Sequence, residues 1–190
     1  MAREISMGIG RLADLLPEPW ANGLGVTQTL AVHASPGLRW RVSLACIDRH
    51  TSYSSFPGCI RWSMVLTGQG VDLAYEDERV LLEPGKMTRF DGALAWEARL
   101  VDQRVGVLNV MAFPATSSLT PEVRMEHVQE ALVSEPARMR LVLADQGPCE
   151  CFVKDACLHL ESGSYLLERD ARMPLRMKAG PLGAVYVAIV

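Results

Sequence analysis

Residues 64–90 read MVLTGQGVDLAYEDERVLLEPGKMTRF, and residues 141–167, LVLADQGPCECFVKDACLHLESGSYLL, repeat the same order of features. Each stretch has an apolar run, a glycine turn, an alternating run, a short charged tip, a third run and a turn marked by Glu-x-Gly. Apolar runs of strand length separated by glycine and polar pairs are typical of β-hairpins. Because the turns recur in the same order as the residue classes, the sequence predicts an internal duplication of one β-rich unit.

The rest of the chain also consists mostly of short apolar runs bounded by Gly, Pro or polar residues, and only residues 132–139 leave room for a helical turn. Many short strands with glycine turns predict an all-β sandwich or barrel. Pro and Ser cluster in residues 113–121, which we expect to be the linker. The expected organisation is therefore an N-terminal half at residues 1–113 and a C-terminal half at residues 121–190.

Composition narrows the class of protein. The 190 residues are 49% hydrophobic and 22% charged, which is typical of a globular protein with a sizeable core. The net charge of -3 and the lack of a basic cluster argue against a nucleic-acid or anionic-membrane surface. No run approaches the roughly 18 apolar residues of a membrane helix, and the N-terminus lacks the apolar core of a signal peptide. We expect a cytoplasmic protein with reduced cysteines.

The five cysteines form no CxxC pair, so a zinc knuckle is not expected. Cys149 and Cys151 lie two residues apart and therefore share one face of a strand, where we expect them to act as small hydrophobic residues.

Two strands have one apolar and one mixed face. In residues 39–48 and 60–67, alternate positions are wholly apolar, whereas the positions between them carry Arg41, Ser43 or Arg61 among small aliphatic residues. A solvent face would carry more Lys, Glu and Asp. The mixed faces resemble a pocket wall, where a few polar groups orient a ligand within an apolar lining. A half-exposed sheet face with two ordinary arginines is the alternative.

Several motifs resemble those of the HutD/Ves family. Residues 19–27, PWANGLGVT, are similar to its W-x-N-G-G-G-x-T signature, and residues 40–45, WRVSLA, to its W-R-x-S-x-A strand. Residues 53–61, YSSFPGCIR, are similar to its F-S-x-F-P-G-x-x-R loop. The pattern continues in order with Gly68, Gly70, Phe90, Gly92 and the segment Asn109-Val110-Met111.

The resemblance implies a bicupin, that is, two degenerate cupin-like barrels in one chain. Members are often encoded beside bacterial histidine-degradation enzymes and are proposed to sense or limit flux through that pathway. The implied activity is binding of a small carboxylate or formyl metabolite such as urocanate, formiminoglutamate or formate. Four departures from the pattern predict an altered ligand site on a retained fold: Leu24 for the middle glycine, Thr29 for an acid, Val107 for an aspartate, and Ala112-Phe113 for a basic pair.

Arg61 is the first candidate for a ligand contact. A guanidinium is a planar fork that pairs bidentately with a carboxylate, and the Phe-Pro-Gly turn before Arg61 restricts the path of the chain. Arg41 and Ser43 could complete an anion site, although Arg41 could equally pair with an acidic loop.

The remaining candidates are aromatic or amide side chains. Trp20 would supply an aromatic wall, and Phe56 would shape the mouth of the site. Asn22 precedes Gly23, so it is either a turn former or an amide donor to the ligand. Asn109 is expected to be buried and must find hydrogen-bond partners in the backbone or in the ligand. The predicted ligand-binding set is Trp20, Asn22, Arg41, Ser43, Phe56, Arg61 and Asn109.

We predict no catalytic, metal or cofactor residues. A metal-dependent cupin needs His-x-His and a following Glu, because imidazoles two apart on a strand project to one side; the four histidines here are isolated in the sequence. The alternative function is a metal-free isomerase or epimerase, for which His50 or Tyr53 with Asp48 is the best available set. A third hypothesis is a partner-binding role with a vestigial pocket.

The apolar C-terminal run, residues 185–190, must be covered by another strand. We expect this pairing to be intramolecular, in a monomer or a homodimer.

Overall fold

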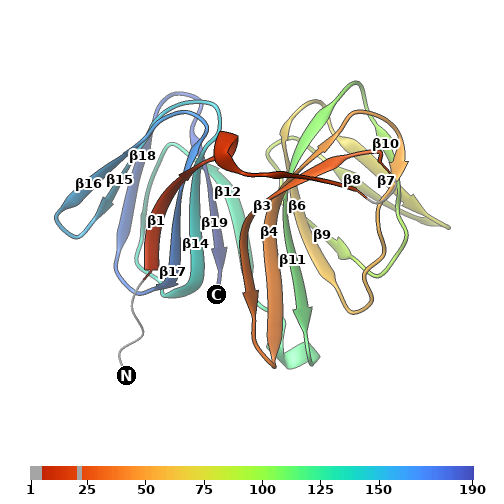
Figure 1. Ribbon diagram of the computed structural model, residues 1–190, viewed down its shortest axis with the longest axis horizontal. Coiled ribbons are helices and arrows are strands. Elements are labelled where there is room, and N and C mark those ends of the chain that lie inside the picture. Colours follow the sequence, from red (N-terminus) through yellow and green to blue (C-terminus); the bar gives the residue numbers. More distant parts are fainter. Residues whose placement is uncertain (1–5, 21–22) are drawn as a thin grey trace. The chain divides into compact units, whose positions relative to one another are not determined.

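The computed structural model describes residues 6–20 and 23–190, and its chain forms two compact units built from strands (Figure 1). The N-terminal cup comprises Leu15–Pro121, and the C-terminal cup comprises Glu122–Val190 with the residues up to Asp14. Two short 3-10 turns, Leu12–Asp14 and Ser117–Leu119, interrupt the strands. Within the described part of the chain, no helix has the length and apolarity that crossing a membrane requires. The all-β prediction is confirmed.

The N-terminal cup has a six-stranded and a four-stranded sheet, both antiparallel. In spatial order, the larger sheet contains β2 (Pro17–Pro19), β3 (Val26–Ala34), β4 (Leu38–Ile47), β11 (Val105–Pro114), β6 (Ile60–Thr67) and β9 (Thr88–Asp91). The smaller contains β5 (Thr51–Ser52), β10 (Glu97–Leu100), β7 (Val71–Tyr75) and β8 (Glu78–Leu82).

One core cluster of the N-terminal cup lies on the mixed faces of the strands. Ile47, Val65 and Val107 continue those faces and pack in one buried cluster with Leu73 and Leu82 of the smaller sheet. The opposite, wholly apolar faces are buried as well, with Trp40, Val42 and Met64 at most 3% exposed. The mixed faces turned into the cup are polar at one end, at Arg41 and Arg61, and apolar at the other.

The C-terminal cup pairs a five-stranded with a four-stranded antiparallel sheet. One edge strand of the larger sheet comes from the start of the described chain. This strand, Ser6–Arg11, pairs along its whole length with Ser164–Arg169. These residues were expected in the N-terminal half at residues 1–113, because no repeat feature marks them, but they belong to the C-terminal unit. In spatial order the sheets are β1 (Ser6–Arg11), β17 (Ser164–Ala171), β14 (Ala137–Ala144), β19 (Ala184–Ile189) and β12 (Val123–Val128), and β13 (Glu130–Val133), β18 (Leu175–Ala179), β15 (Cys149–Val153) and β16 (Ala156–Leu160).

The C-terminal strand β19 pairs with β14 on one side and with β12 on the other, so the expected intramolecular pairing is confirmed. Residues 132–139, which left room for a helical turn, instead hold the end of β13 and the start of β14.

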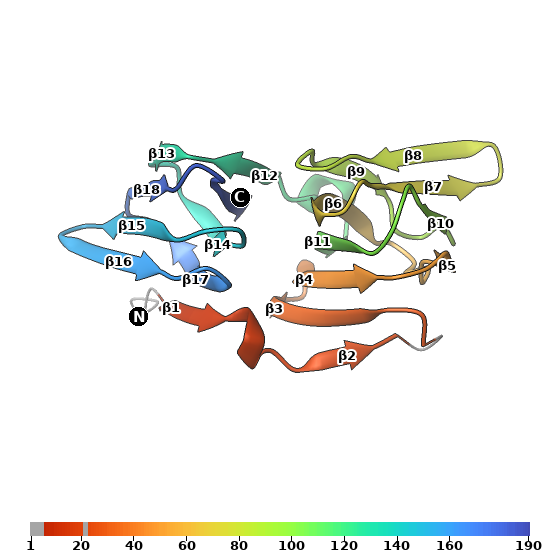
Figure 2. The ribbon, with the colours of Figure 1, turned by 90° about the horizontal axis from the view of Figure 1, so that it is seen from above.

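The duplicated stretches have matching turns. Both hairpins, β7–β8 and β15–β16, close with two-residue loops whose first residue has positive φ: 49° at Glu76 and 53° at Lys154 (Figure 2). The following Glu-x-Gly turns also match, with φ of 70° at Gly85 and 80° at Gly163. Left-handed backbone is uncommon and most readily adopted by glycine. Its recurrence at corresponding positions supports the duplication inferred from the sequence.

Candidate functional site

Strand register places the predicted site residues in two rows across β4, β11 and β6. Met111 is directly opposite Arg41 on one side and Arg61 on the other, and Asn109 is opposite Ser43 and Ser63 in the same way. Directly paired residues project to the same face of a sheet, and so do residues two apart on one strand. Both rows therefore point into the cup, with two arginines on the outer strands of the first row.

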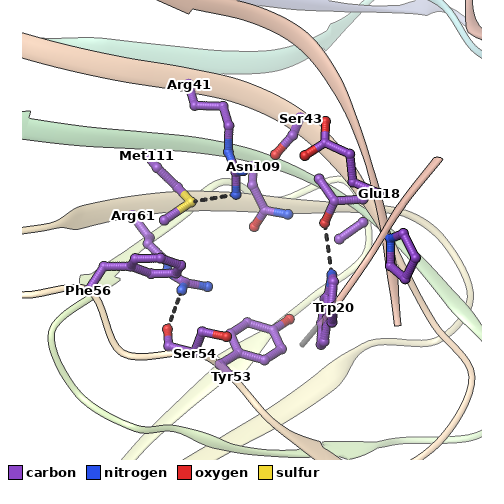
Figure 3. Close-up of a pocket in the computed structure, with 13 residues that line it drawn as sticks. Glu18, Trp20, Arg41, Ser43, Tyr53, Ser54, Phe56, Arg61, Asn109 and Met111 are labelled. Atoms are coloured by element: carbon purple, nitrogen blue, oxygen red, sulfur yellow. Dashed lines mark hydrogen bonds between the residues drawn. The ribbon is translucent and has the colours of Figure 1, made fainter. Parts of the chain in front are cut away.

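These rows border a cavity of about 340 Å³ (Figure 3). That volume is at the small end of the roughly 300–1,000 Å³ typical of ligand pockets. In Figure 3, Arg61 lies beside Phe56 at one end, whereas Trp20 and Glu18 lie at the other, with Asn109 between them. The lining residues are Glu18, Pro19, Trp20, Thr27, Arg41, Ser43, Ala45, Tyr53, Ser54, Phe56, Arg61, Asn109 and Met111.

Arg61 is buried, with 7% of its surface exposed. Its guanidinium lies 5.3 Å from the ring centres of both Tyr53 and Phe56, and Nη2 donates to the Ser54 carbonyl at 2.6 Å. Its Nε has no hydrogen-bond partner, and no carboxylate of the described residues pairs with it. Burial lowers the pKa of Arg61, although the group stays charged because arginine is not deprotonated in proteins. The site therefore holds a positive charge that is not paired with a carboxylate of residues 6–20 or 23–190.

Tyr53 places a second unsatisfied polar atom in the same wall. The residue is 4% exposed, and its hydroxyl has no hydrogen-bond partner. Burial raises the pKa of Tyr53 far above its ordinary value, against a smaller opposite effect of Arg61. The hydroxyl is therefore protonated at neutral pH and can donate a hydrogen bond to a ligand oxygen.

Arg41 and Asn109 are only partly engaged by the protein. Arg41 is half-buried, and its Nη2 contacts the Met111 sulfur at 3.5 Å. Asn109 accepts a hydrogen bond from the Ser63 hydroxyl at 2.6 Å and donates to the Val107 carbonyl at 3.2 Å. An amide can make four hydrogen bonds. Asn109 is thus positioned by the protein and retains capacity for a ligand.

Trp20 begins a closed turn. Its backbone N–H donates to the Gly25 carbonyl at 2.9 Å, and the Gly23 N–H donates to the Trp20 carbonyl at 2.9 Å. A Cβ on Gly25 would lie 2.8 Å from the Trp20 ring, so glycine is required for the ring to pack there. The indole N–H donates to the Thr27 hydroxyl at 2.8 Å. Asn22 lies outside the described residues, and its predicted role stays a prediction.

The structure accounts for three departures from the family pattern. Leu24 does not have positive φ, so a side chain fits where the family has its middle glycine. Thr29 donates to the Glu18 carboxylate at 2.8 Å, so an acid is still present beside position 29. Val107 is fully buried in the apolar core beneath the site. The carboxylate of the cavity therefore comes from Glu18.

The alternative catalytic set is not assembled. Tyr53 lines the cavity, but Asp48 pairs with Arg49 at 2.9 Å, and His50 accepts a hydrogen bond from the Leu100 N–H at 3.2 Å. Neither Asp48 nor His50 belongs to the lining. The described lining also offers one carboxylate and no imidazole or thiolate, which does not fit the His-rich metal site of a metal-dependent cupin.

All the predicted site residues that the structure describes, Trp20, Arg41, Ser43, Phe56, Arg61 and Asn109, line this one cavity. Their role in binding stays a prediction. Glu18 also lines the cavity but was not predicted from the sequence. It lies two residues before Trp20, so on an extended segment its side chain projects to the same side as that of Trp20. No binding role was predicted for Thr27 or Ser54, although both occur in the quoted motifs.

Comparisons with known proteins agree with this architecture. A family model described as HutD matches residues 12–184. No curated protein matches the chain at a significant level. Among solved structures, the chain is similar to a conserved protein of unknown function from Pseudomonas aeruginosa PAO1, with a TM-score of 0.84 and 22% identity over 97% of this chain and 98% of that one.

Two further structures place the fold among cupins. HutD from Pseudomonas fluorescens SBW25, described as a formate condition, has a TM-score of 0.74 and 23% identity over 97% of this chain and 98% of that one. The bacterial pirin YhhW from Escherichia coli, in complex with nickel(II), has a TM-score of 0.65 and 10% identity over 97% and 99%. At these identities the likeness shows the fold, a bicupin.

Proposed function

The chain belongs to the HutD family, and we propose that its N-terminal cup binds a small carboxylate metabolite of histidine degradation as a regulatory signal, without a metal. The observation that carries the proposal is the buried, uncompensated guanidinium of Arg61. A buried charge is costly unless it is paired. A ligand carboxylate would supply the missing partner.

The two unsatisfied atoms in the wall favour the same ligand group. Arg61 Nε and the Tyr53 hydroxyl both lack a protein acceptor, and both are donors. A carboxylate offers two acceptor oxygens with about four lone-pair sites. Arg41, in the same row, brings a second positive charge toward the cavity.

Glu18 favours a ligand with a donor at its other end. Its carboxylate lies in the lining on the Trp20 side of the cavity (Figure 3). A carboxylate accepts hydrogen bonds and repels a second anion. Urocanate combines one carboxylate with an imidazole N–H, and formiminoglutamate combines two carboxylates with a formimino N–H, whereas formate has no N–H donor. We therefore propose the two larger intermediates as ligands in preference to formate.

A regulatory role fits a site that can bind without reacting. Glu18 is the one carboxylate among the described lining residues, and no base held by an acid faces the cavity among them. Catalysis by proton transfer needs such a base within hydrogen-bond reach of the substrate. A metabolite that binds only the folded state would stabilise the protein.

Calorimetric titration with urocanate, formiminoglutamate and formate tests the proposal. Arg61→Met should weaken binding about tenfold to a hundredfold, since a hydrogen bond to a charged group contributes about 1.5–3 kcal/mol. Arg89→Met is the matched control, because Arg89 also contacts an aromatic ring, that of Trp62, but projects from the opposite face of the same sheet. Silent titrations with all three ligands, or equal affinity in both variants, would refute the proposal.

A further inference from the structure

The outer face of hairpin β15–β16 gathers three metal-ligating side chains. Glu150 on β15 is directly opposite His159 on β16, and Cys157 lies two residues before His159 on the same strand. Directly opposed residues and residues two apart project to one face. The other face of this hairpin, with Cys149, Cys151 and Leu160, packs in the core. The three side chains therefore face solvent together.

Their distances suit a single ion. Glu150 Oε1 is 3.5 Å from His159 Nδ1, and Cys157 Sγ is 3.7 Å from His159 Nε2. One ligand atom from each residue can be chosen so that all three lie within 4.8 Å of one another. Ligands bound tetrahedrally at about 2.0–2.3 Å from zinc are roughly 3.3–3.8 Å apart. Glu150 and Cys157 contact different nitrogens of the imidazole, and only one nitrogen can bind the ion, so side-chain rotation is needed to direct all three donors to one point.

The position of the hairpin leaves this group accessible. β16 is the edge strand of its sheet, next to β15 alone (Figure 2). Cys157 is exposed, whereas Cys59, Cys149 and Cys151 are buried and Cys46 is half-buried. The group lies in the C-terminal cup and shares no residue with the cavity of the N-terminal cup.

We propose that Glu150, Cys157 and His159 form a binding site for a borderline divalent transition metal, Zn²⁺ in the first place. Thiolate, imidazole and carboxylate are the three side-chain donors that zinc prefers. Ca²⁺ and Mg²⁺ take oxygen ligands and do not fit a thiolate–imidazole pair. Three protein ligands leave a fourth position open to water. Lys178 on β18 is the strand partner of Glu150, and its positive charge would repel the cation and lower the affinity of the site.

The proposal is tested with Co²⁺, which substitutes for zinc and absorbs in the near ultraviolet when a thiolate binds it. The wild-type chain should take up one Co²⁺ with a sulfur-to-cobalt charge-transfer band, and Zn²⁺ should displace it. Cys157→Ser should abolish the band. His159→Gln should weaken binding at least about tenfold, since even outer-shell partners of a metal contribute about 10- to 100-fold.

Two controls separate this site from unspecific metal binding. Cys46→Ser and His127→Gln remove one residue of each type elsewhere in the chain and should leave both band and affinity unchanged. In the unaltered protein, Zn²⁺ should also slow alkylation of Cys157 by iodoacetamide. A band that survives Cys157→Ser, or alkylation at the same rate with and without Zn²⁺, would overturn the proposal.

Discussion

Arg61 is held in place by groups that cannot neutralise it. Two aromatic rings and one backbone carbonyl contact its guanidinium, and burial lowers its pKa. Cation–π contacts contribute about 0.5–2 kcal/mol each, which offsets only part of the cost of taking a charge out of water. The same contacts fix the orientation of the guanidinium before a ligand arrives, which lowers the entropy cost of binding.

Tyr53→Phe separates a binding role from a structural one. The hydroxyl has no protein partner, so its removal should leave thermal stability unchanged or slightly higher. If it donates to the ligand, affinity should fall about threefold to tenfold, from the roughly 0.5–1.5 kcal/mol of one hydrogen bond. Differential scanning fluorimetry and calorimetry measure the two effects. A stability loss above about 2 kcal/mol with unchanged affinity would show a hidden structural partner.

Glu18→Gln tests which end of the ligand lies on the Trp20 side of the cavity. The carboxylate should accept an N–H of urocanate or formiminoglutamate, so the amide should weaken their binding by about tenfold. Formate, which lacks a second polar end, should bind the variant as well as the wild type or better, because a negative charge is removed. Calorimetric titration of urocanate and formate against the variant and the wild type gives the loss of affinity for each ligand. An equal loss for urocanate and formate would contradict a contact between Glu18 and the N–H end of the ligand.

At the level of elements, the turn from Trp20 to Gly25 determines one wall of the cavity. Gly25→Ala should displace the Trp20 ring, because the new methyl group would lie 2.8 Å from it. We expect a shift of the Trp20 indole N–H signal in NMR spectra, from its bond to Thr27, and weaker ligand binding. Gly147→Ala, where an added Cβ meets nothing within 4 Å, is the control. An unshifted indole signal would show that the backbone absorbs the change.

The sequence predicted elements best where apolar periodicity and turn chemistry agree. The duplicated hairpins and the strands β4, β6 and β11 follow from such patterns. Strands β1, β2, β5, β9 and β18 were not predicted. Ser6–Arg11 and Pro17–Pro19 carry glycine or proline, and Thr51–Ser52 and Thr88–Asp91 are short and mostly polar. Leu175–Ala179 does alternate apolar and basic residues, which is a strand pattern, but it is only five residues long. The pairing of these strands depends on partners distant in sequence, which local propensity does not encode.

The site was predictable to the extent that motifs and strand faces specify it. Arg41, Ser43 and Arg61 were recognised from the mixed faces, and register then brought them into rows. Their composition predicted a pocket wall, and these residues do line the cavity. Glu18 was not recognised, since its pairing with Thr29 joins two strands across a turn.

At the scale of the whole molecule, each cup buries an arginine, but only one of the two arginines is paired with a carboxylate of the described residues. Arg140 on β14, which aligns with Ser63 of the first repeat, is fully buried and lies 3.5 Å from the Glu168 carboxylate. It also donates to the carbonyls of Met173 and Glu135. The C-terminal cup thus supplies its own counter-ion, whereas the N-terminal cup leaves Arg61 without one. This difference supports the proposal that the carboxylate ligand binds in the N-terminal cup.

Double-variant unfolding tests the internal pair. Glu168→Leu alone should destabilise the protein by about 3–5 kcal/mol, because it leaves Arg140 buried without a counter-ion. Adding Arg140→Met should recover much of that loss, since apolar replacement of a buried pair is often neutral or stabilising. Urea denaturation of both variants measures the effect. Losses that simply add would show that the two groups do not interact.

The same pair predicts a pH dependence. Burial raises the pKa of Glu168 above its usual value, against a smaller opposite effect of Arg140. A raised folded-state pKa contributes stability that is present below the ordinary carboxyl pKa and is lost as pH rises through the raised value. The stability of the double variant relative to the wild type should therefore be higher at neutral than at acidic pH. The reverse order in urea denaturation would contradict this assignment.

The position of a bound carboxylate in a crystal structure with urocanate tests the central claim most directly. Our account predicts the carboxylate inside the N-terminal cup, with its oxygens about 2.7–2.9 Å from guanidinium nitrogens of Arg61 or Arg41 and within reach of the Tyr53 hydroxyl. A cup that stays free of ligand at saturating urocanate, or a carboxylate bound elsewhere on the chain, would contradict it.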